Sequence, residues 1–487
     1  MDFGNYLALI APELLISISG LVLLLITAWV GDSAARPVSI LAALVLGVAC
    51  FMVGPALLEG AAGPDTSAFA GQFRADGFAA FAKMLIYVSG IACLMIAPPF
   101  FERLGAMRAE YPVLILFAVL GTGIMVSSGN LITLYIGLEL SSLAAYVLAS
   151  FLPGSGRSAE AGLKYFILGA LASGILLYGM SLVYGFTGTT DFTLIRAAMA
   201  LELSTGALFG LIFVLAGLAF KIAAVPFHMW TPDVYEGAPT PVTTFFASAP
   251  KVAAVALTVR VSLDAFGLQA DAWRQIVIFA ALASIVLGAL GAIGQDNLKR
   301  LLAYSSINNV GFILIGLAAG TPQGASAVLV YLAIYVVMTI GSFVAILMLR
   351  DAEGSYVENI RDIAGLSRAK PVIALILAGM MLSLAGLPPM FGFWGKFVVF
   401  QAAVQADLIL LAALGIAASV IGAFYYLKVV KVMFFDEPAG VVQGRSETGH
   451  WVLLIAMAII VSPLGYLLTI PLGLLADRAA VSLFLLP

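Results

Sequence analysis

Residues 217–242 read GLAFKIAAVPFHMWTPDVYEGAPTPV and lie at the end of an apolar run that starts near residue 206. The run 206–236 exceeds 30 residues, whereas about 20 suffice to cross a bilayer. It carries a charge at Lys221 and prolines at Pro226 and Pro232. Proline removes a backbone donor and clashes with the preceding turn, and free carbonyls in hydrocarbon are tolerated only where they line protein or a watery cavity. The stretch therefore predicts a membrane helix that is interrupted inside the protein.

A second interruption of the same kind follows later in the chain. The run 371–402 contains LSLAGLPPMFGFWGKFVVF at 382–400, with Lys396 beside Pro388 and Pro389. A simple proline kink is the alternative for each run. The two runs are the seventh and twelfth predicted spans, five apart, and a repeat with an odd number of spans is inverted in its second copy. Paired interruptions in an inverted repeat indicate a transport path.

The composition agrees with a membrane protein. The chain has 487 residues, 62% hydrophobic and 10% charged, against about 45–50% and about 25% in globular proteins. These values exclude a disordered chain, a disulfide scaffold and a soluble enzyme with one anchor. The formal net charge of −3 points to no nucleic-acid partner.

Fourteen spans are expected, with short loops and no soluble domain. They lie near 6–30, 37–58, 77–98, 111–128, 130–152, 160–187, 206–236, 240–266, 272–294, 298–319, 322–349, 371–402, 407–434 and 450–473. The predicted fold class is all-α and polytopic, with inverted five-helix repeats in spans 4–8 and 9–13.

Loop charges predict the orientation. Twelve basic residues fall in loops on one side and five on the other, which favours the first side as cytoplasmic and places both termini outside. The first side holds Arg36, Arg103, Arg108, Arg157, Lys299, Arg300, Arg350, Arg361, Arg368, Lys370, Lys431 and Arg445, and the second holds Arg74, Arg196, Arg260, Arg274 and Arg478. Loops rich in alanine, glycine and arginine suggest a bacterial source, and hence the cell inner membrane.

Six lysines remain inside the predicted spans: Lys83, Lys164, Lys221, Lys251, Lys396 and Lys428. Among the acids, Glu139 alone lies deep within a span, and a central charge costs about 2.5–3.5 kcal/mol on insertion scales. Lys83 and Lys428 lie close enough to span ends to snorkel to the interface. The depth of Lys164 leaves its role ambiguous.

Two interpretations of the central lysines stay open. They could pair with Glu139 and only fix the helix packing, or they could carry protons. One acid cannot neutralise three central lysines, and desolvation disfavours a charged amine, so buried lysines that exchange protons are the favoured interpretation. His228, seven residues after Lys221, suits a relay but could equally cap free carbonyls. The polar run from Tyr304 to Asn309 could hold ordered water.

No cofactor motif is present in the sequence. Cys50 and Cys93 lie in apolar runs, and the only histidines are His228 and His450, so neither a thiolate metal site nor a bis-histidine haem is expected. No phosphate-binding loop, dinucleotide fingerprint or cysteine cluster appears. The chain is expected to move charge without carrying electrons.

The motifs resemble a known family. LYIGLELSSLAAYVLASF at 134–151, GLKYFILGA at 162–170 and the stretch 219–255 are similar to the antiporter-like, proton-conducting subunits of respiratory NADH–quinone oxidoreductase (complex I). NLKRLLAYSSINNVGFILIG at 297–316 and residues 382–397 extend the resemblance over roughly residues 110–435. DVYEGAPTPV, together with a lysine in span 12, resembles the subunit N branch of this family.

The resemblance implies a role for each candidate residue. Glu139 and Lys221 match the acid and the lysine of the family's Glu–Lys pair. Lys164 matches its modulating lysine, Lys251 the central lysine and Lys396 the terminal lysine of the path, while His228 matches the histidine after the first break. Flavin and iron–sulfur centres are expected in partner subunits, quinone reduction takes place elsewhere, and the partners are those subunits, membrane lipids and protons.

The expected domains are a three-helix segment at 1–110, five-helix repeats at 111–266 and 267–435, and a polar loop with the last helix at 436–487. A subunit of a multi-subunit sodium/proton antiporter is the first alternative function. A membrane scaffold without transport is the second.

Overall fold

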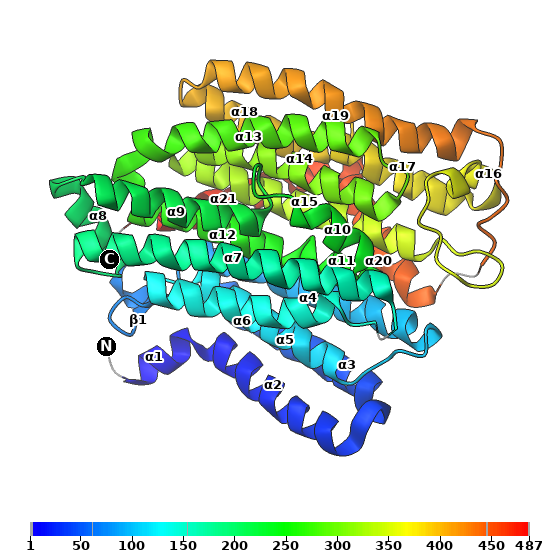
Figure 1. Cartoon of the computed structure of the whole chain (residues 1–487), viewed down its shortest axis with the longest axis horizontal. Coiled ribbons are helices and arrows are strands. Elements are labelled where there is room, and N and C mark those ends of the chain that lie inside the picture. The colour runs from blue at the N-terminus through cyan, green and yellow to red at the C-terminus, as the bar shows by residue number, and fades with distance from the viewer. Residues whose placement is uncertain (1–2, 61, 153, 445–446, 486–487) are drawn as a thin grey trace.

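A computed structural model describes residues 3–60, 62–152, 154–444 and 447–485 as one helical bundle (Figure 1). Eleven helical segments in this described part are long and apolar enough to cross a membrane. The expectation of an all-α polytopic membrane protein is therefore confirmed, apart from a two-residue ribbon of β1 (Ser67–Ala68) and β2 (Phe73–Arg74). The count of fourteen spans stays a prediction.

The longer helices follow the predicted runs closely. They are α1 (Phe3–Leu9), α2 (Ala11–Val30), α3 (Ala35–Glu59), α4 (Gly77–Arg103), α5 (Glu110–Val126), α6 (Leu131–Ala149), α7 (Gly156–Thr187), α8 (Phe192–Leu201), α9 (Thr205–Ile222), α10 (Trp230–Gly237), α11 (Thr240–Phe246), α12 (Ala249–Arg260), α13 (Ala270–Ile293), α14 (Leu298–Ala318), α15 (Pro322–Leu347), α16 (Leu366–Ala369), α17 (Pro371–Ala385), α18 (Gly392–Gln405), α19 (Ile409–Phe435), α20 (Thr448–Val461) and α21 (Thr469–Ser482).

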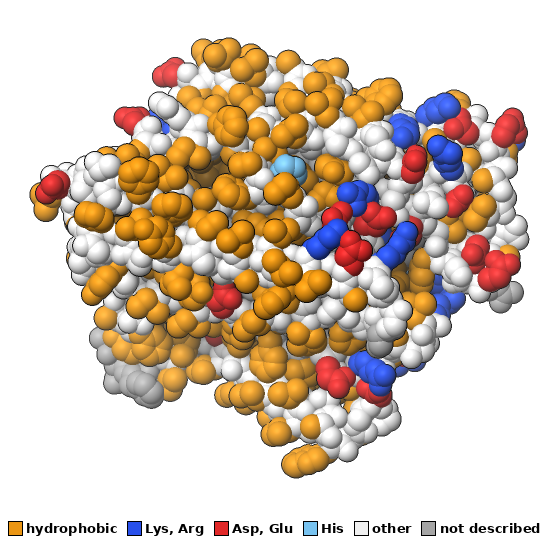
Figure 2. Space-filling model, in the orientation of Figure 1, with side chains coloured by type: hydrophobic (Ala, Val, Ile, Leu, Met, Phe, Trp, Pro, Cys, Tyr) orange, Lys and Arg blue, Asp and Glu red, His pale blue; other side chains and the backbone are white. Residues whose placement is uncertain are grey.

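The two ends of the bundle differ in charge. Figure 1 shows the N- and C-terminal ends of the chain on the same end of the bundle, beside β1, with α16 at the opposite end. On the face shown in Figure 2, lysine and arginine side chains gather at the α16 end, while apolar side chains cover the middle. An apolar belt with charged ends is the surface that a bilayer requires.

The innermost helices are α12, α14 and α15. In each of the corresponding spans, 94% of the most apolar window is buried, against 28% for the α2–α3 run at the edge. A helix that is hydrophobic all round is expected in the centre of a membrane bundle. Polar side chains on these central helices are therefore enclosed by protein.

Three elements differ from the expectation. The span 240–266 is divided between α11 and α12, because Pro250 begins a new helix after Ser248, and it ends in a π-turn, Val261–Ala265. The last predicted span stops at Ser462, where Pro463 starts a 3₁₀ turn, and the chain then continues through α21 to Ser482. The short helix α8 lies between α7 and α9 and was not expected. Arg445 lies outside the described residues.

Two arginines that were assigned to outer loops are buried. Arg260 makes a bidentate contact to Asp76, at 2.8 and 2.7 Å, and its guanidinium is fully enclosed. Arg74 pairs with Asp264 of the π-turn. These pairs tie the β-ribbon and the start of α4 to the end of α12.

The snorkelling expected for Lys83 is wrong. Its ammonium lies 2.6 Å from Oε1 of Glu13, and the two side chains are 2% and 8% exposed. Glu13 stands in the first turn of α2, so Glu139 is not the only acid enclosed in the helix bundle. Lys428 is partly buried and donates to the carbonyls of Ile293 and Gln295, both at 3.2 Å, at the end of α13.

Candidate functional site

The first interruption separates α9 from α10. The helix α9 ends at Ala223, whose φ of 61° is left-handed, and the Val225–Pro226 peptide is cis. The amide of Val225 donates to Oγ of Ser284 at 2.9 Å, and the indole of Trp230 donates to the carbonyl of Phe220 at 3.0 Å. Side chains thus satisfy backbone groups that the break leaves without helical partners.

The second interruption repeats this geometry between α17 and α18. The helix α17 ends at Gly386, with a φ of 77°, and the Pro388–Pro389 peptide is cis. In both breaks the left-handed residue comes three positions before the cis proline. The amide of Gly392 donates to Oγ of Ser383 at 2.9 Å. The expected pair of interrupted helices is therefore present.

A buried lysine contacts the free carbonyl at each break. Lys251 donates from Nζ to the carbonyl of Ile222 at 2.8 Å, and Lys396 donates to that of Ala385 at 2.7 Å. Each carbonyl belongs to the residue directly before the left-handed one. The C-terminus of a helix carries partial negative charge, so it replaces part of the hydration that these ammonium groups, 2% and 6% exposed, have lost.

The expected pair of Glu139 and Lys221 is open. Lys221 donates to Oγ of Ser142 at 2.7 Å, and no ion pair within 4.0 Å joins it to Glu139 in the described part of the chain. Oε1 of Glu139 is buried and has no hydrogen-bond partner among these residues. Glu139 is nevertheless close enough to interact electrostatically with the lysine. Ser142, three residues further along α6, therefore holds the ammonium away from the carboxylate.

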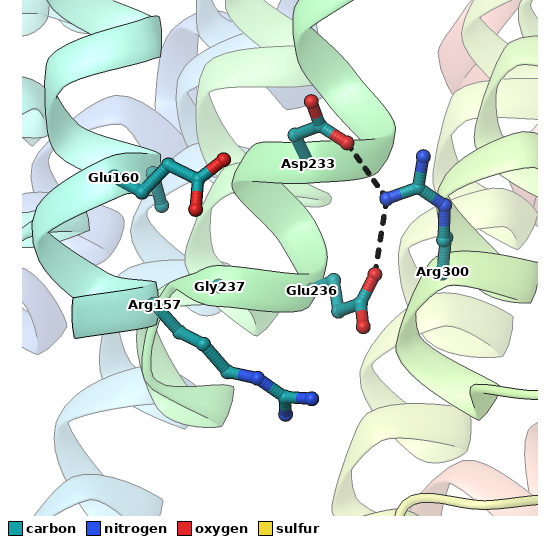
Figure 3. A pocket seen from close by; sticks show the side chains of 7 residues that line it. Arg157, Glu160, Asp233, Glu236, Gly237 and Arg300 are labelled. Atoms are coloured by element: carbon teal, nitrogen blue, oxygen red, sulfur yellow. Dashed lines mark hydrogen bonds and ion pairs between the residues drawn. The ribbon is translucent and has the colours of Figure 1, made fainter. Parts of the chain in front are cut away.

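Lys164 lies in a different group of charges. Its Nζ is 2.6 Å from Glu160 and 2.6 Å from Asp233 of α10, and its side chain is 40% exposed. Arg300 at the start of α14 contacts the same Asp233 at 2.7 Å and Glu236 at 3.0 Å. Figure 3 shows Arg300 reaching across to both carboxylates.

Sequence reasoning missed this charged group. Together with Arg157, it lines a cavity of about 140 Å³ beside a larger polar cavity of about 550 Å³. Lys299, which was assigned to a loop, is buried, donates to the carbonyl of Ala238 at 2.7 Å and lies 3.4 Å from Glu358. The available signal was DVYEG and NLKR at helix ends, which read as ordinary loop charges.

His228 lies in the irregular segment between α9 and α10 and is partly buried. Its Nδ1 has no hydrogen-bond partner within the described residues. A free ring nitrogen beside the first break could accept a proton, although no hydrogen bond joins it to Lys221 there.

Polar residues of α14 form a continuous chain between the two breaks. Tyr331 donates to Oδ1 of Asn309 at 2.7 Å, and Asn309 in turn donates to the carbonyl of Ser305 at 2.7 Å. Tyr335 donates to Oγ of Ser306 at 2.8 Å. The ring of Tyr331 packs beside Gly395 of α18, so this chain reaches the second break.

These features define a class of protein. Paired interrupted helices, whose free carbonyls face buried charges and which a polar chain connects, are the architecture of an ion-translocating membrane protein. No group of three or more His, Cys, Asp and Glu side chains that could hold a metal occurs in the described residues.

The chain belongs to the NADH:quinone oxidoreductase/Mrp antiporter transmembrane family, which matches residues 128–422. It is 73% identical over 485 residues to the NADH-quinone oxidoreductase subunit N of Erythrobacter litoralis, with 100% of both chains covered. A chain of respiratory complex I from Thermus thermophilus is 31% identical, with a TM-score of 0.82, over 96% of this chain and 99% of that one. A chain of the Mrp complex from Dietzia, 23% identical with a TM-score of 0.86 over 99% and 98%, shares the fold.

Proposed function

We propose that the chain is the subunit N of a bacterial NADH–quinone oxidoreductase, an antiporter-like membrane subunit that translocates protons. The relatives that support this are 57–73% identical over nearly their full length and carry that name. The sodium/proton antiporter alternative is not favoured, because the Mrp likeness is 23% identical and extends to the fold alone. NADH oxidation and quinone reduction belong to partner subunits, with flavin and iron–sulfur centres expected there and no cofactor in this chain.

The proton path runs through Glu139, Lys164, Lys221, His228, Lys251 and Lys396. One observation carries this proposal: at both breaks a buried lysine donates to the carbonyl directly before the left-handed residue. Such a lysine is poised to give up its proton, because the carbonyl supplies only part of the hydration that a charged amine prefers. The polar chain of α14 offers hydroxyl and amide groups between the two breaks.

Lys221 and Glu139 would act as the switch of the first half. With Lys221 on Ser142, the ammonium has a neutral partner. Movement onto Glu139 favours the charged lysine, and movement back favours release, so the position of the ammonium controls its proton affinity. Lys164 would tune this step through Asp233, to which it is paired.

The same proposal covers topology. The breaks divide the chain into a three-helix segment at 1–110, inverted repeats at 111–266 and 267–435, and a last segment at 436–487. Both termini lie at the end opposite the α16 charges, and the positive-inside bias then places them on the periplasmic side of the bacterial inner membrane.

The test is NADH-driven acidification of inverted membrane vesicles, with NADH oxidation recorded in parallel, for wild type and Lys221→Ala. We expect both rates to fall in the variant while the complex still assembles. Unchanged rates would show that the buried lysine is structural and would favour the scaffold alternative.

A further inference from the structure

The N-terminal helices hold a second buried ion pair, away from the two breaks. Nζ of Lys83 on α4 lies 2.6 Å from Oε1 of Glu13 on α2. The ammonium also stands over the ring of Phe73, 4.8 Å from its centroid. Neither lysine nor acid belongs to the path proposed above.

The pair is incompletely satisfied. Apart from the contact to Lys83, the oxygens of Glu13 have no hydrogen-bond partner in the described residues, and the same holds for the hydroxyl of the buried Tyr87 beside them. A buried ion pair offsets its desolvation only if further hydrogen bonds satisfy the remaining atoms. A purely structural bridge is therefore a poor account of this pair, and groups of this kind call for water or for a change of protonation.

A cavity leads to the lysine. About 450 Å³ of space is bounded by Lys83 together with Leu9, Pro12, Pro55 and Ala75. These residues come from α1, the start of α2, the end of α3 and the segment before α4, all at the end of the bundle that carries the termini. One water takes roughly 30 Å³ in the liquid, so a file of several waters fits between the surface and the ammonium.

Few other titratable groups face the pair. Cys50 comes from α3 and Tyr87 from α4, while the charged neighbours Arg74 and Asp76 in the preceding segment are committed to Asp264 and Arg260. From α5 the pair meets Gly123, where an added Cβ would lie 3.2 Å from Oε1 of Glu13.

The pair is one helix away from the central site. Two residues before Gly123, Gly121 packs against α6, and an added Cβ there would lie 2.4 Å from the amide of Ser141. The helix α6 carries Glu139, so α5 alone stands between the two acids.

We propose that Glu13 and Lys83 form a second protonatable site, which exchanges protons with water through this cavity while the complex translocates. The inference rests on the proposed function. An N–H bond of the Lys83 ammonium breaks as an O–H bond forms on Glu13, which leaves a neutral amine and a neutral carboxyl. The amine then takes a proton from a hydronium ion in the cavity, and the carboxyl returns its proton to water, which restores the ion pair.

The decisive variant is Lys83→Arg, because arginine keeps the charge and the pairing but does not release its proton. Lys431→Arg is the matched control: Lys431 pairs with Asp436 at the same 2.6 Å but is 65% exposed. Acidification per assembled complex is measured in NADH-energised inverted vesicles. We expect Lys83→Arg and Glu13→Gln each to lower it at least threefold while the control matches wild type. A Lys83→Arg complex that pumps like wild type overturns the proposal.

Failure to assemble is resolved by further variants. If Lys83→Arg does not assemble, Glu13→Gln decides alone, and normal pumping overturns the proposal. If neither assembles, the double variant Glu13→Leu/Lys83→Leu replaces the pair by apolar residues, which proteins often tolerate. Pumping by this double variant, or absence of assembly in all three, assigns a structural role and overturns the proposal, whereas assembly without pumping supports it. Lys221→Ala is measured alongside: if it pumps normally, the proposed function fails independently of Lys83.

Discussion

Removing one hydroxyl should test how Lys221 is held. In Ser142→Ala the ammonium loses the acceptor that now lies at 2.7 Å, and the carboxylate of Glu139, whose Oε1 is unpartnered, becomes the nearest alternative. Ser142 also donates to the carbonyl of Leu138 at 2.6 Å, but that helical carbonyl keeps a backbone partner. The substitution therefore removes little besides the contact to the lysine.

The size of the effect follows from that contact. A hydrogen bond to a charged group contributes about 1.5–3 kcal/mol, and about 1.4 kcal/mol corresponds to a factor of ten. The equilibrium between the open and closed Glu139–Lys221 pair should thus shift roughly tenfold to a hundredfold toward closure. Because a closed pair favours the charged lysine, proton release becomes slower by a similar factor where this step limits turnover.

The assay is acidification of inverted vesicles by NADH, normalised to the amount of assembled complex. Ser142→Thr keeps a hydroxyl and should pump near the wild-type rate. Ser141→Ala is the control, since Ser141 is equally buried, at 6% exposed, and makes no hydrogen bond to Lys221 in the described residues. The reasoning is refuted if Ser142→Ala pumps as fast as Ser141→Ala.

Three further outcomes are expected. Lys251→Met should leave the break carbonyl without its donor, at about 1–3 kcal/mol, and abolish proton translocation; normal vesicle acidification would contradict this. Arg260→Ala leaves Asp76 buried without its bidentate partner, so it should destabilise the protein by about 3–5 kcal/mol, seen as a lower unfolding temperature in detergent, while an unchanged temperature would count against it. The guanidinium of Arg103 holds the pKa of Glu447 below its ordinary value; this contribution to stability is complete above the unfolded pKa of about 4.3 and is lost as the pH falls through the folded value. The unfolding temperature of Glu447→Gln should therefore converge with that of wild type in acid and lie below it at neutral pH.

Both interruptions could be predicted from the sequence, because their cause is local. Proline chemistry acts on the preceding turn, and a run of more than 30 apolar residues is visible without any tertiary information. The positions of Lys251 and Lys396 beside the breaks followed from the same stretches. Their partners did not, since a break carbonyl offers no side-chain signal.

The prediction for Lys83 failed for a physical reason. Depth along a helix was used to decide that its stem could reach the interface, but depth does not state which way a side chain faces. The ammonium points inward to Glu13, and the segment 60–76 folds over that end of the bundle. Arg260 was misjudged in the same way, because its partner Asp76 stands 184 residues earlier in the chain.

The sequence by itself determined that the chain is a membrane bundle with two broken helices, where the breaks fall, and which charges had to be accounted for. Apolar length, proline and the cost of burying charge are properties of a segment and act wherever that segment lies. Only the tertiary structure decided that Lys221 rests on Ser142, that Lys164 turns to Asp233 and that Lys83 pairs with Glu13. In a bilayer a charged group takes the nearest polar partner that the neighbouring helices present, and that neighbour is set by packing between segments far apart in the chain.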